Sequence, residues 1–337
     1  MADRMKGRLL TIAPPLLLLA VLLVLPAAGL SPNLIRLFFI TFVFMITGIG
    51  WNLVGGFTGQ VSFGFAVFYG LGAYGTALMI NAGMNPFVSL LAGALTAMIA
   101  SFLVGLPTFR LRGPYFVIAT IGVTEAVRVF MSNMGFTGGA SGYRINEYAK
   151  FRQVEHYYTA LVAVALALSV SMLISKSRFG LALRAIKQDQ DAAADVGVNP
   201  YTFKLWAHAI AAGLTGVAGG IYARYAIFLD PGDVFAFQKG ISILLISVIG
   251  GIGTVWGPVL GGLVVGIVEE QLVVKFPNIH LLLYGILLIL IILFEPDGIV
   301  GLLRKLNNLF RRSRDNSGSG SADKVLWGRS RLEGREL

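Results

Sequence analysis

Few side chains in this sequence could carry chemistry, and the most notable is a carboxylate within an apolar run. Glu125 lies past the middle of the run over residues 113–133. A carboxylate at that depth of a membrane-spanning helix is costly, so it should face the bundle interior and have a partner. Arg128, three residues later, can pair with it or extend to the interface. We expect a structural ion pair or a contact with a solute, and Thr120 in the same run is a further pathway candidate.

A glycine-rich break separates two other apolar runs. Residues 55–60 read Gly-Gly-Phe-Thr-Gly-Gln. Backbone that is not helical persists at membrane depth only where it is buried or lines a watery path. The break therefore predicts pathway residues at Thr58, Gly59, Gln60 and Ser62, and a tight cytoplasmic turn is the alternative interpretation.

The sequence offers little to an enzyme. Residues 139–142 match the G-x-S-G of intramembrane serine proteases, and His208, a possible base, follows in a later span, but Ser141 precedes a polar segment instead of starting a buried helix. The chain has no cysteine, and its 3 histidines lack metal-ligand spacing. No phosphate-binding G-x-x-x-x-G-K-[ST] loop occurs. We expect no cofactor on this chain, and any ATP must be bound elsewhere.

The elements that must position these residues are membrane-spanning helices. Hydrophobic residues make up 56% of the 337 residues and charged residues 13%, which is too little polar surface for a soluble fold of this size. The sequence predicts an all-α polytopic bundle of eight to ten spans, with broken or re-entrant helices near the glycines of residues 250–253. The candidate spans are residues 9–30, 33–54, 60–81, 86–108, 113–133, 157–175, 205–228, 239–254, 257–275 and 279–294.

The distribution of positive charge predicts the orientation. Most of the 27 Lys and Arg residues fall in the amino-terminal segment, at residues 110–112, in the loop over 176–204 and in the tail. With ten crossings all four lie on one side, so both termini should be cytoplasmic. The formal charge of +10 then needs no nucleic acid to explain it. We expect a first span within residues 1–32, a transport domain over 33–303 and a disordered tail over 304–337.

The internal loop over residues 176–204 has the pattern of a short amphipathic helix. Phe179, Leu183 and Ile186 share one face, and Gly197 is positioned to end the helix. The pattern alone fits a helix lying in the lipid headgroups or one that docks a soluble partner.

Seven motifs occur in an order that resembles the branched-chain amino acid ABC transporter permease family, specifically its M-type permease subunit. The resemblance covers roughly residues 33–303. The two departures are Phe65, where the family often has histidine, and Asp191, which replaces the first residue of the EAA-x-x-x-G coupling motif. The motifs are residues 59–64, Gly72-Ala73-Tyr74, 111–116, Thr137-Gly138-Gly139, 191–197 and 250–258, with 294–298 following them.

The resemblance implies a non-enzymatic permease of the bacterial inner membrane that imports leucine, isoleucine and valine by ATPase-driven alternating access. It implies a second homologous permease, two ATP-binding subunits and a periplasmic solute-binding protein as partners. Its coupling residues are expected to be Arg184, Asp191, Ala192, Ala193 and Gly197. A permease for urea or short amides and an ion-coupled carrier are the alternatives.

Overall fold

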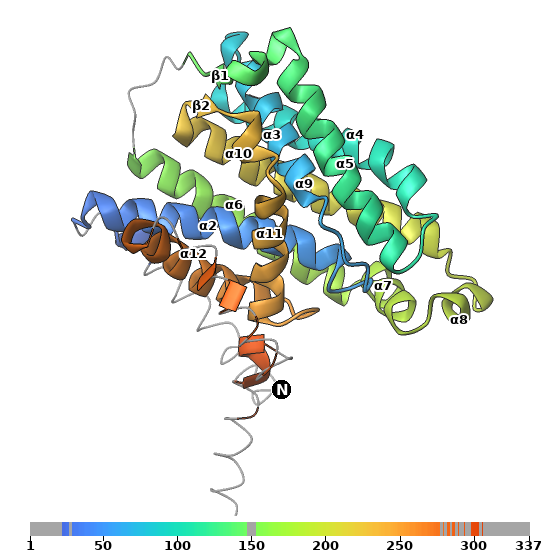
Figure 1. The fold of residues 1–337 in the computed structure, drawn as a ribbon. Helices are drawn as coiled ribbons and strands as arrows, with labels where there is room; N and C mark the ends of the chain where they lie inside the picture. The colour runs from blue at the N-terminus through green and yellow to red at the C-terminus, as the bar shows by residue number, and fades with distance from the viewer. Residues whose placement is uncertain are drawn as a thin grey trace, which may run out of the picture.

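The computed structural model describes residues 22–26, 29–146 and 153–276, with a few scattered positions between 279 and 305. It is a helical bundle, as expected (Figure 1). The expected spans 9–30 and 279–294 lie wholly or largely outside the described residues, as does the tail over 304–337. The long helices are α2 (Pro32–Val54), α3 (Phe65–Asn81), α4 (Pro86–Thr108), α5 (Pro114–Asn133), α6 (Gln153–Lys176), α9 (Pro200–Ala226), α11 (Phe237–Gly250) and α12 (Gly257–Lys275).

These eight helices correspond to the eight spans expected over the same residues. Within the described part of the chain, 6 helical segments are long and apolar enough to cross a membrane, while α3 and residues 257–269 are shorter apolar helices. The chain is therefore a multi-pass membrane protein. The shortness of α3 corrects the span expected over 60–81, because the helix begins only at Phe65.

Proline and asparagine fix several helix starts. Helices α2, α4, α5, α9 and α12 each have proline in the first turn, where its missing N–H costs nothing. The side chains of Asn85 and Asn199 accept hydrogen bonds from the first-turn amides of α4 and α9. The turns between helices are therefore encoded locally.

Small residues let the central helices pack with their backbones in contact. Helix α9 lies against both α3 and α4, and a side chain at Gly72 of α3 would collide with the backbone of Gly216 of α9. A Cβ on Gly216 itself would come within 2.6 Å of Ala97 on α4, and one on Gly220 would collide with Thr76. Gly216 and Gly220 therefore let the helix backbones approach closely.

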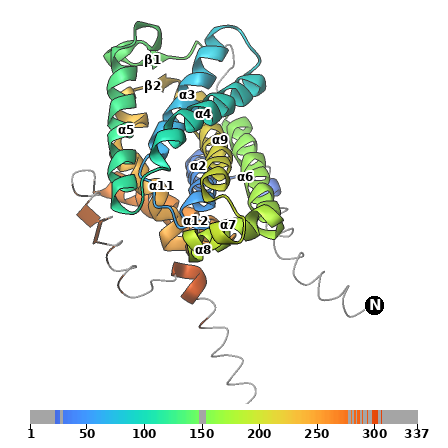
Figure 2. The same ribbon diagram turned by 90° about the vertical axis from the view of Figure 1, so that its right-hand side faces the viewer.

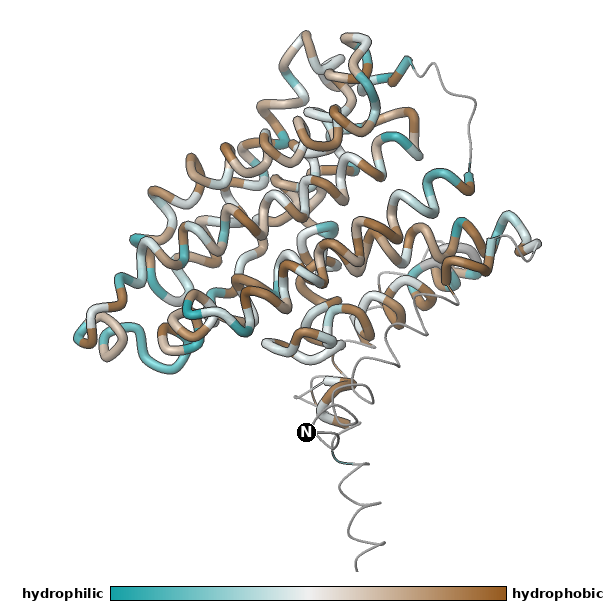
Figure 3. The backbone as a smooth tube through the Cα atoms, turned by 180° about the vertical axis from the view of Figure 1, so that it is seen from behind, coloured by the Kyte–Doolittle hydropathy of each residue, from teal (hydrophilic) through white to brown (hydrophobic). Residues whose placement is uncertain are grey.

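One face of the bundle is largely apolar. Helix α4 exposes a regular series of large aliphatic side chains, and α6 exposes another. Helices α2 and α9 are mostly buried between the others. Figure 3 shows how apolar residues run along the outer helices. This face suits contact with lipid tails. The series are Leu91, Leu95, Ile99 and Leu103 on α4, and Val162, Leu166 and Leu173 on α6.

The two ends of the bundle differ. At one end, β1 (Tyr143–Arg144) pairs antiparallel with β2 (Phe228–Leu229) near the short helices η1 (Gly135–Thr137), η2 (Gly139–Ser141) and α10 (Pro231–Val234). At the other end lie α7 (Arg178–Gln188) and α8 (Gln190–Asp195) (Figure 2). We call these the β1–β2 end and the α7–α8 end.

Candidate functional site

The loop predicted to form one amphipathic helix forms two. Helix α7 ends at Gln188 and α8 starts at Gln190, with Asp189 extended between them. The Asp189 carboxylate accepts hydrogen bonds from the amides of Asp191 (2.9 Å) and Ala192 (3.0 Å). An aspartate side chain that caps a new helix favours ending the previous helix at that point. The prediction of a single helix was therefore wrong.

The face predicted for α7 is confirmed. Leu183 and Ile186 are buried, and the ring of Phe179 stacks on Phe203 of α9 at 5.4 Å. The Arg184 guanidinium donates to the Ser175 carbonyl (2.6 Å) and lies over the ring of Phe57 at 5.9 Å. Arg184 thus ties α7 to the rest of this chain.

The coupling-like motif lies on the surface of the α7–α8 end. Arg112, in the turn between α4 and α5, donates two hydrogen bonds to the Asp191 carboxylate, at 3.0 and 3.1 Å. Ala192 is exposed and Ala193 is buried. Gly197 has φ of +88°, a backbone that suits glycine and ends α8 as predicted. The pairing with Arg112 was not foreseen, because 79 residues separate the partners.

Two aliphatic side chains project from this end. Leu181 of α7 is 69% exposed, and Val196, just after α8, is 79% exposed. Among charged residues at a membrane surface, such side chains suit contact with lipid headgroups or with a protein. The exposed surface of α7 and α8, with Leu181, Asp191, Ala192 and Val196, is called the α7–α8 platform below.

The glycine-rich break lies against this platform. Lys187 of α7 donates to the carbonyl of Gly56 (2.9 Å), and a Cβ on Gly59, whose φ is +73°, would come within 3.2 Å of the Lys187 side chain. The hydroxyl of Thr58 only caps its own helix by donating to Val54 (2.7 Å). This part of the break is a turn at the α7–α8 end.

Gln60 makes a buried polar contact at the same end. The ammonium of Lys204, on α9, donates to the side-chain carbonyls of Gln60 (2.8 Å) and Gln190 (2.5 Å). Lys204 is 6% exposed. It therefore joins the break, α8 and α9 through one cation, a role that its position in the sequence did not suggest.

A second glycine break closes onto the first. Helix α11 ends at Gly250 and α12 begins at Gly257, so the predicted interruption at residues 250–253 is present. Buried Asn52 donates to the Thr254 carbonyl and accepts from the Gly253 amide, both at 2.8 Å. The side chain of Asn52 therefore fixes this turn beside α2.

Ser62 and Thr120, both predicted pathway residues, lie together. The Thr120 hydroxyl accepts from the amide of Phe63 (3.2 Å), and that of Ser62 accepts from the amide of Gly64 (3.1 Å). Thr120 lies six residues beyond Pro114, or about 9 Å along α5. Backbone that is not helical, at residues 62–64, therefore reaches well into the membrane-spanning region, where only a buried or water-lining segment is stable.

Glu125 is paired as predicted but faces the opposite way. Its carboxylate accepts from Arg128, with 2.9 Å between Oε2 and Nε. The Glu125 side chain is 56% exposed and that of Arg128 35% exposed. The expectation that Glu125 faces the interior of this chain's bundle is therefore wrong. Helix α5 packs loosely on its neighbours, and its charged pair lies on an open face.

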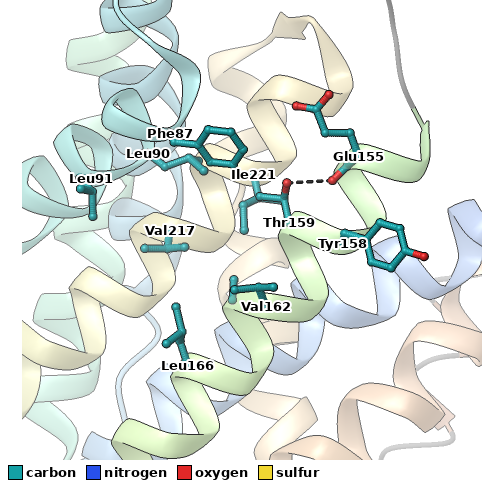
Figure 4. A pocket seen from close by; sticks show the side chains of 11 residues that line it. Phe87, Leu90, Leu91, Glu155, Tyr158, Thr159, Val162, Leu166, Val217 and Ile221 are labelled. Atoms are coloured by element: carbon teal, nitrogen blue, oxygen red, sulfur yellow. Dashed lines mark hydrogen bonds between the residues drawn. The ribbon is translucent and has the colours of Figure 1, made fainter. Parts of the chain in front are cut away.

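A pocket of about 480 Å³ opens between α4, α6 and α9 on the apolar face (Figure 4). Its lining is aliphatic and aromatic apart from Glu155, Tyr158 and Thr159. The Glu155 carboxylate accepts from buried Arg224 of α9 at 3.2 Å. We assign no function to this pocket.

The serine and histidine of the protease alternative lie apart. His208 is buried with its ring 4.8 Å from that of Phe68 and 5.1 Å from that of Phe109, and neither ring nitrogen has a hydrogen-bond partner among the described residues. Ser141 lies in η2 at the β1–β2 end. Within the described residues, no group of three His, Asp or Glu side chains could hold a metal ion.

Comparison with known proteins identifies this arrangement of spans as that of a transport permease. Residues 33–292 match the family described as the branched-chain amino acid transport system permease component. The chain therefore belongs to that family.

Its relatives carry the names of such permeases. It is 30% identical to the high-affinity branched-chain amino acid transport system permease protein LivM of Escherichia coli K12, over 87% of this chain and 77% of that protein. It is 29% identical to the Salmonella typhimurium LivM, over 78% and 69%. The LivH permease of E. coli K12 is 25% identical over 77% of this chain and 91% of that protein. No solved structure matches.

Proposed function

We propose that this chain is the transmembrane permease subunit of an ABC importer that moves leucine, isoleucine and valine inward across a bacterial inner membrane. Both termini and the α7–α8 end face the cytoplasm, where most Lys and Arg residues gather. The relatives named as branched-chain amino acid permeases support this solute class.

The observation that carries the proposal is the construction of the α7–α8 platform. Two short helices present exposed aliphatic side chains, while Arg112 and Lys204 join them to α5 and α9. A force on the platform would therefore be transmitted to two spans instead of being lost in a flexible loop. In this proposal a pair of ATP-binding subunits docks there and supplies the ATP chemistry, and this chain binds no cofactor.

The face of α5 is proposed to border the solute pathway and a second, homologous permease. Glu125 and Arg128 are both partly exposed on a membrane-spanning helix. Charged groups inside a membrane face a protein partner or water in preference to lipid tails. In this proposal Thr58, Gly59, Gln60, Ser62 and Thr120 belong to the same pathway, at its cytoplasmic end. A periplasmic binding protein would deliver the solute to the β1–β2 end.

The test is to purify the chain from its native membrane in mild detergent and identify the proteins that accompany it by mass spectrometry. The proposal predicts two copies of ATP-binding protein and a second permease of the same family. A stable preparation that lacks any ATP-binding protein contradicts it and favours an ion-coupled carrier. If the partners are present, uptake of labelled urea but not leucine by the assembled complex would instead favour a permease for urea or short amides.

A further inference from the structure

Lys239, near the start of α11, has an unusual setting. Its ammonium nitrogen lies 5.7 Å from the ring centroid of Tyr69 on α3 and 5.7 Å from that of Tyr222 on α9. In the part of the chain that the structure describes, no hydrogen bond or ion pair joins it to an acceptor. Two aromatic faces orient this cation, but its three N–H donors are left for another partner.

The lysine lies inside the membrane-spanning region. The next residue, Gly240, packs directly on the carbonyl oxygen of Phe63, and the ring of Phe237 lies 5.9 Å from that of Phe63. Phe63 in turn donates its amide to Thr120 of α5. Helix α11 therefore begins beside the start of α3, within the bundle. A lysine at such depth is a candidate for a transport function.

Carboxylates lie nearby. The side chain of Tyr222, one of the two rings that contact Lys239, interacts with the carboxylate of Asp233 on α10. Asp230 caps the start of α10, and α10 packs against α5, the helix that carries Arg128. Charges of both signs therefore gather around α10. Figure 1 shows α10 beside α3, with α11 following it.

The opposite side of the molecule carries fewer charges, and its Glu155–Arg224 pair lies near one end of α6. Figure 2 shows α5 and α11 on the side away from α6. The described part of α4 has no charged residue, and α6 has them only near its ends. The α5–α10–α11 side therefore presents charges of both signs at membrane depth, while the α4–α6 face is apolar. A zwitterion is a solute whose two charges suit such a surface.

We infer that Lys239 binds the carboxylate of an α-amino acid during its passage, and that the carboxylate of Asp233 receives the α-ammonium group. This inference rests on the proposed function and adds the residues that recognise the solute within the membrane. The rings of Tyr69 and Tyr222 hold the lysine in place before the solute arrives. The amino-terminal end of α11, which no side chain caps, adds positive potential at the same point.

Such a site recognises the backbone of an amino acid, and it leaves the aliphatic side chain to be selected elsewhere. It also predicts that the charge of Lys239, and not only its bulk, is needed for passage. A lysine that merely packs on two tyrosines would be replaced by methionine with little effect on transport.

The experiment uses the complete importer with its partner subunits in proteoliposomes, with leucine-loaded binding protein outside. Labelled leucine uptake and stimulated ATP hydrolysis are measured in parallel for Lys239→Met, Lys239→Arg and Asp233→Asn. Lys275→Met, at the exposed end of α12, is the matched control. Lys239→Gln replaces the methionine variant if the latter does not assemble.

We expect Lys239→Met to lower leucine uptake about tenfold or more, the loss of one charge-assisted contact. Stimulated ATP hydrolysis should stay within about twofold of wild type, because docking and the α7–α8 platform are untouched. Asp233→Asn should behave similarly, and Lys239→Arg should retain much of the uptake. The control should transport normally.

The inference is overturned if an assembled Lys239→Met or Lys239→Gln variant imports leucine at the wild-type rate. It is also overturned if Lys239→Arg loses uptake as fully as the methionine variant, since charge would then not be the requirement. A wild-type complex that imports no leucine at all contradicts the proposed function itself, so the two failures are distinct.

Discussion

The guanidinium of Arg112 and the carboxylate of Asp191 form a two-point contact at 3.0 and 3.1 Å that joins the turn before α5 to helix α8. Both side chains are largely exposed, 69% and 73%. A surface ion pair of this kind contributes roughly 0–1 kcal/mol to folding. The main role of this ion pair is therefore to connect the α7–α8 platform to α5.

Reversing one charge of this pair should uncouple transport without unfolding the chain. Asp191→Arg places two guanidinium groups together and should lower leucine uptake severalfold, while the thermal unfolding midpoint stays nearly unchanged. The double variant Asp191→Arg with Arg112→Asp restores the pair and should recover uptake. Normal transport by the single variant would exclude this contact from coupling.

Lys204 should matter more for stability. Lys204→Met leaves the partly buried side chains of Gln60 and Gln190 without their donor, a loss of about 1–3 kcal/mol. A lower unfolding midpoint of the purified protein, by a few degrees, is the expected result. Lys176→Met, at the exposed end of α6, is the control and should unfold like wild type. Equal midpoints for both variants would show that the cation is not a structural link.

The close glycine contact between α3 and α9 can be tested by comparing two glycine-to-alanine variants. Gly72→Ala inserts a methyl group against the backbone of Gly216 and should reduce the yield of folded protein. Gly122→Ala, on α5, meets nothing within 4 Å and should be neutral or slightly stabilising. Size-exclusion profiles of the two variants in detergent test this. A monodisperse Gly72→Ala variant at wild-type yield would contradict the close packing.

Glu125 is proposed to border the pathway. Because its side chain is exposed, a substitution there can change transport without changing stability. Glu125→Gln removes the charge with little change in shape, so uptake should fall severalfold while the unfolding midpoint is retained. Lower stability with unchanged uptake would indicate a structural ion pair instead. Arg128→Gln is measured in parallel. If the ion pair acts as a unit, both variants should lose uptake to the same extent.

Much of the fold was predictable because long apolar runs permit only one kind of structure in lipid. Eight expected spans became helices, and Leu183 and Ile186 are buried as their spacing indicates. The break at Asp189 was not predicted, although aspartate is a common N-cap residue and is therefore a local signal for the start of a new helix.

The contacts that build the α7–α8 platform could not be predicted from the sequence. Lys204 and Gln60 are 144 residues apart, and no periodicity relates them. The orientation of Glu125 was predicted wrongly, because a single chain need not enclose all of its charged side chains in its own bundle. A charged face that is open in a single chain is compatible with the membrane only if something polar covers it.

The most direct test of the account is ATP-dependent uptake by the reconstituted complex. Proteoliposomes that contain this chain, its partner permease and the ATP-binding subunits are loaded with ATP, and labelled leucine is added with the binding protein outside. The proposed function predicts accumulation of leucine that requires ATP hydrolysis and that persists when ion gradients are collapsed. Accumulation that follows an ion gradient and ignores ATP would contradict it.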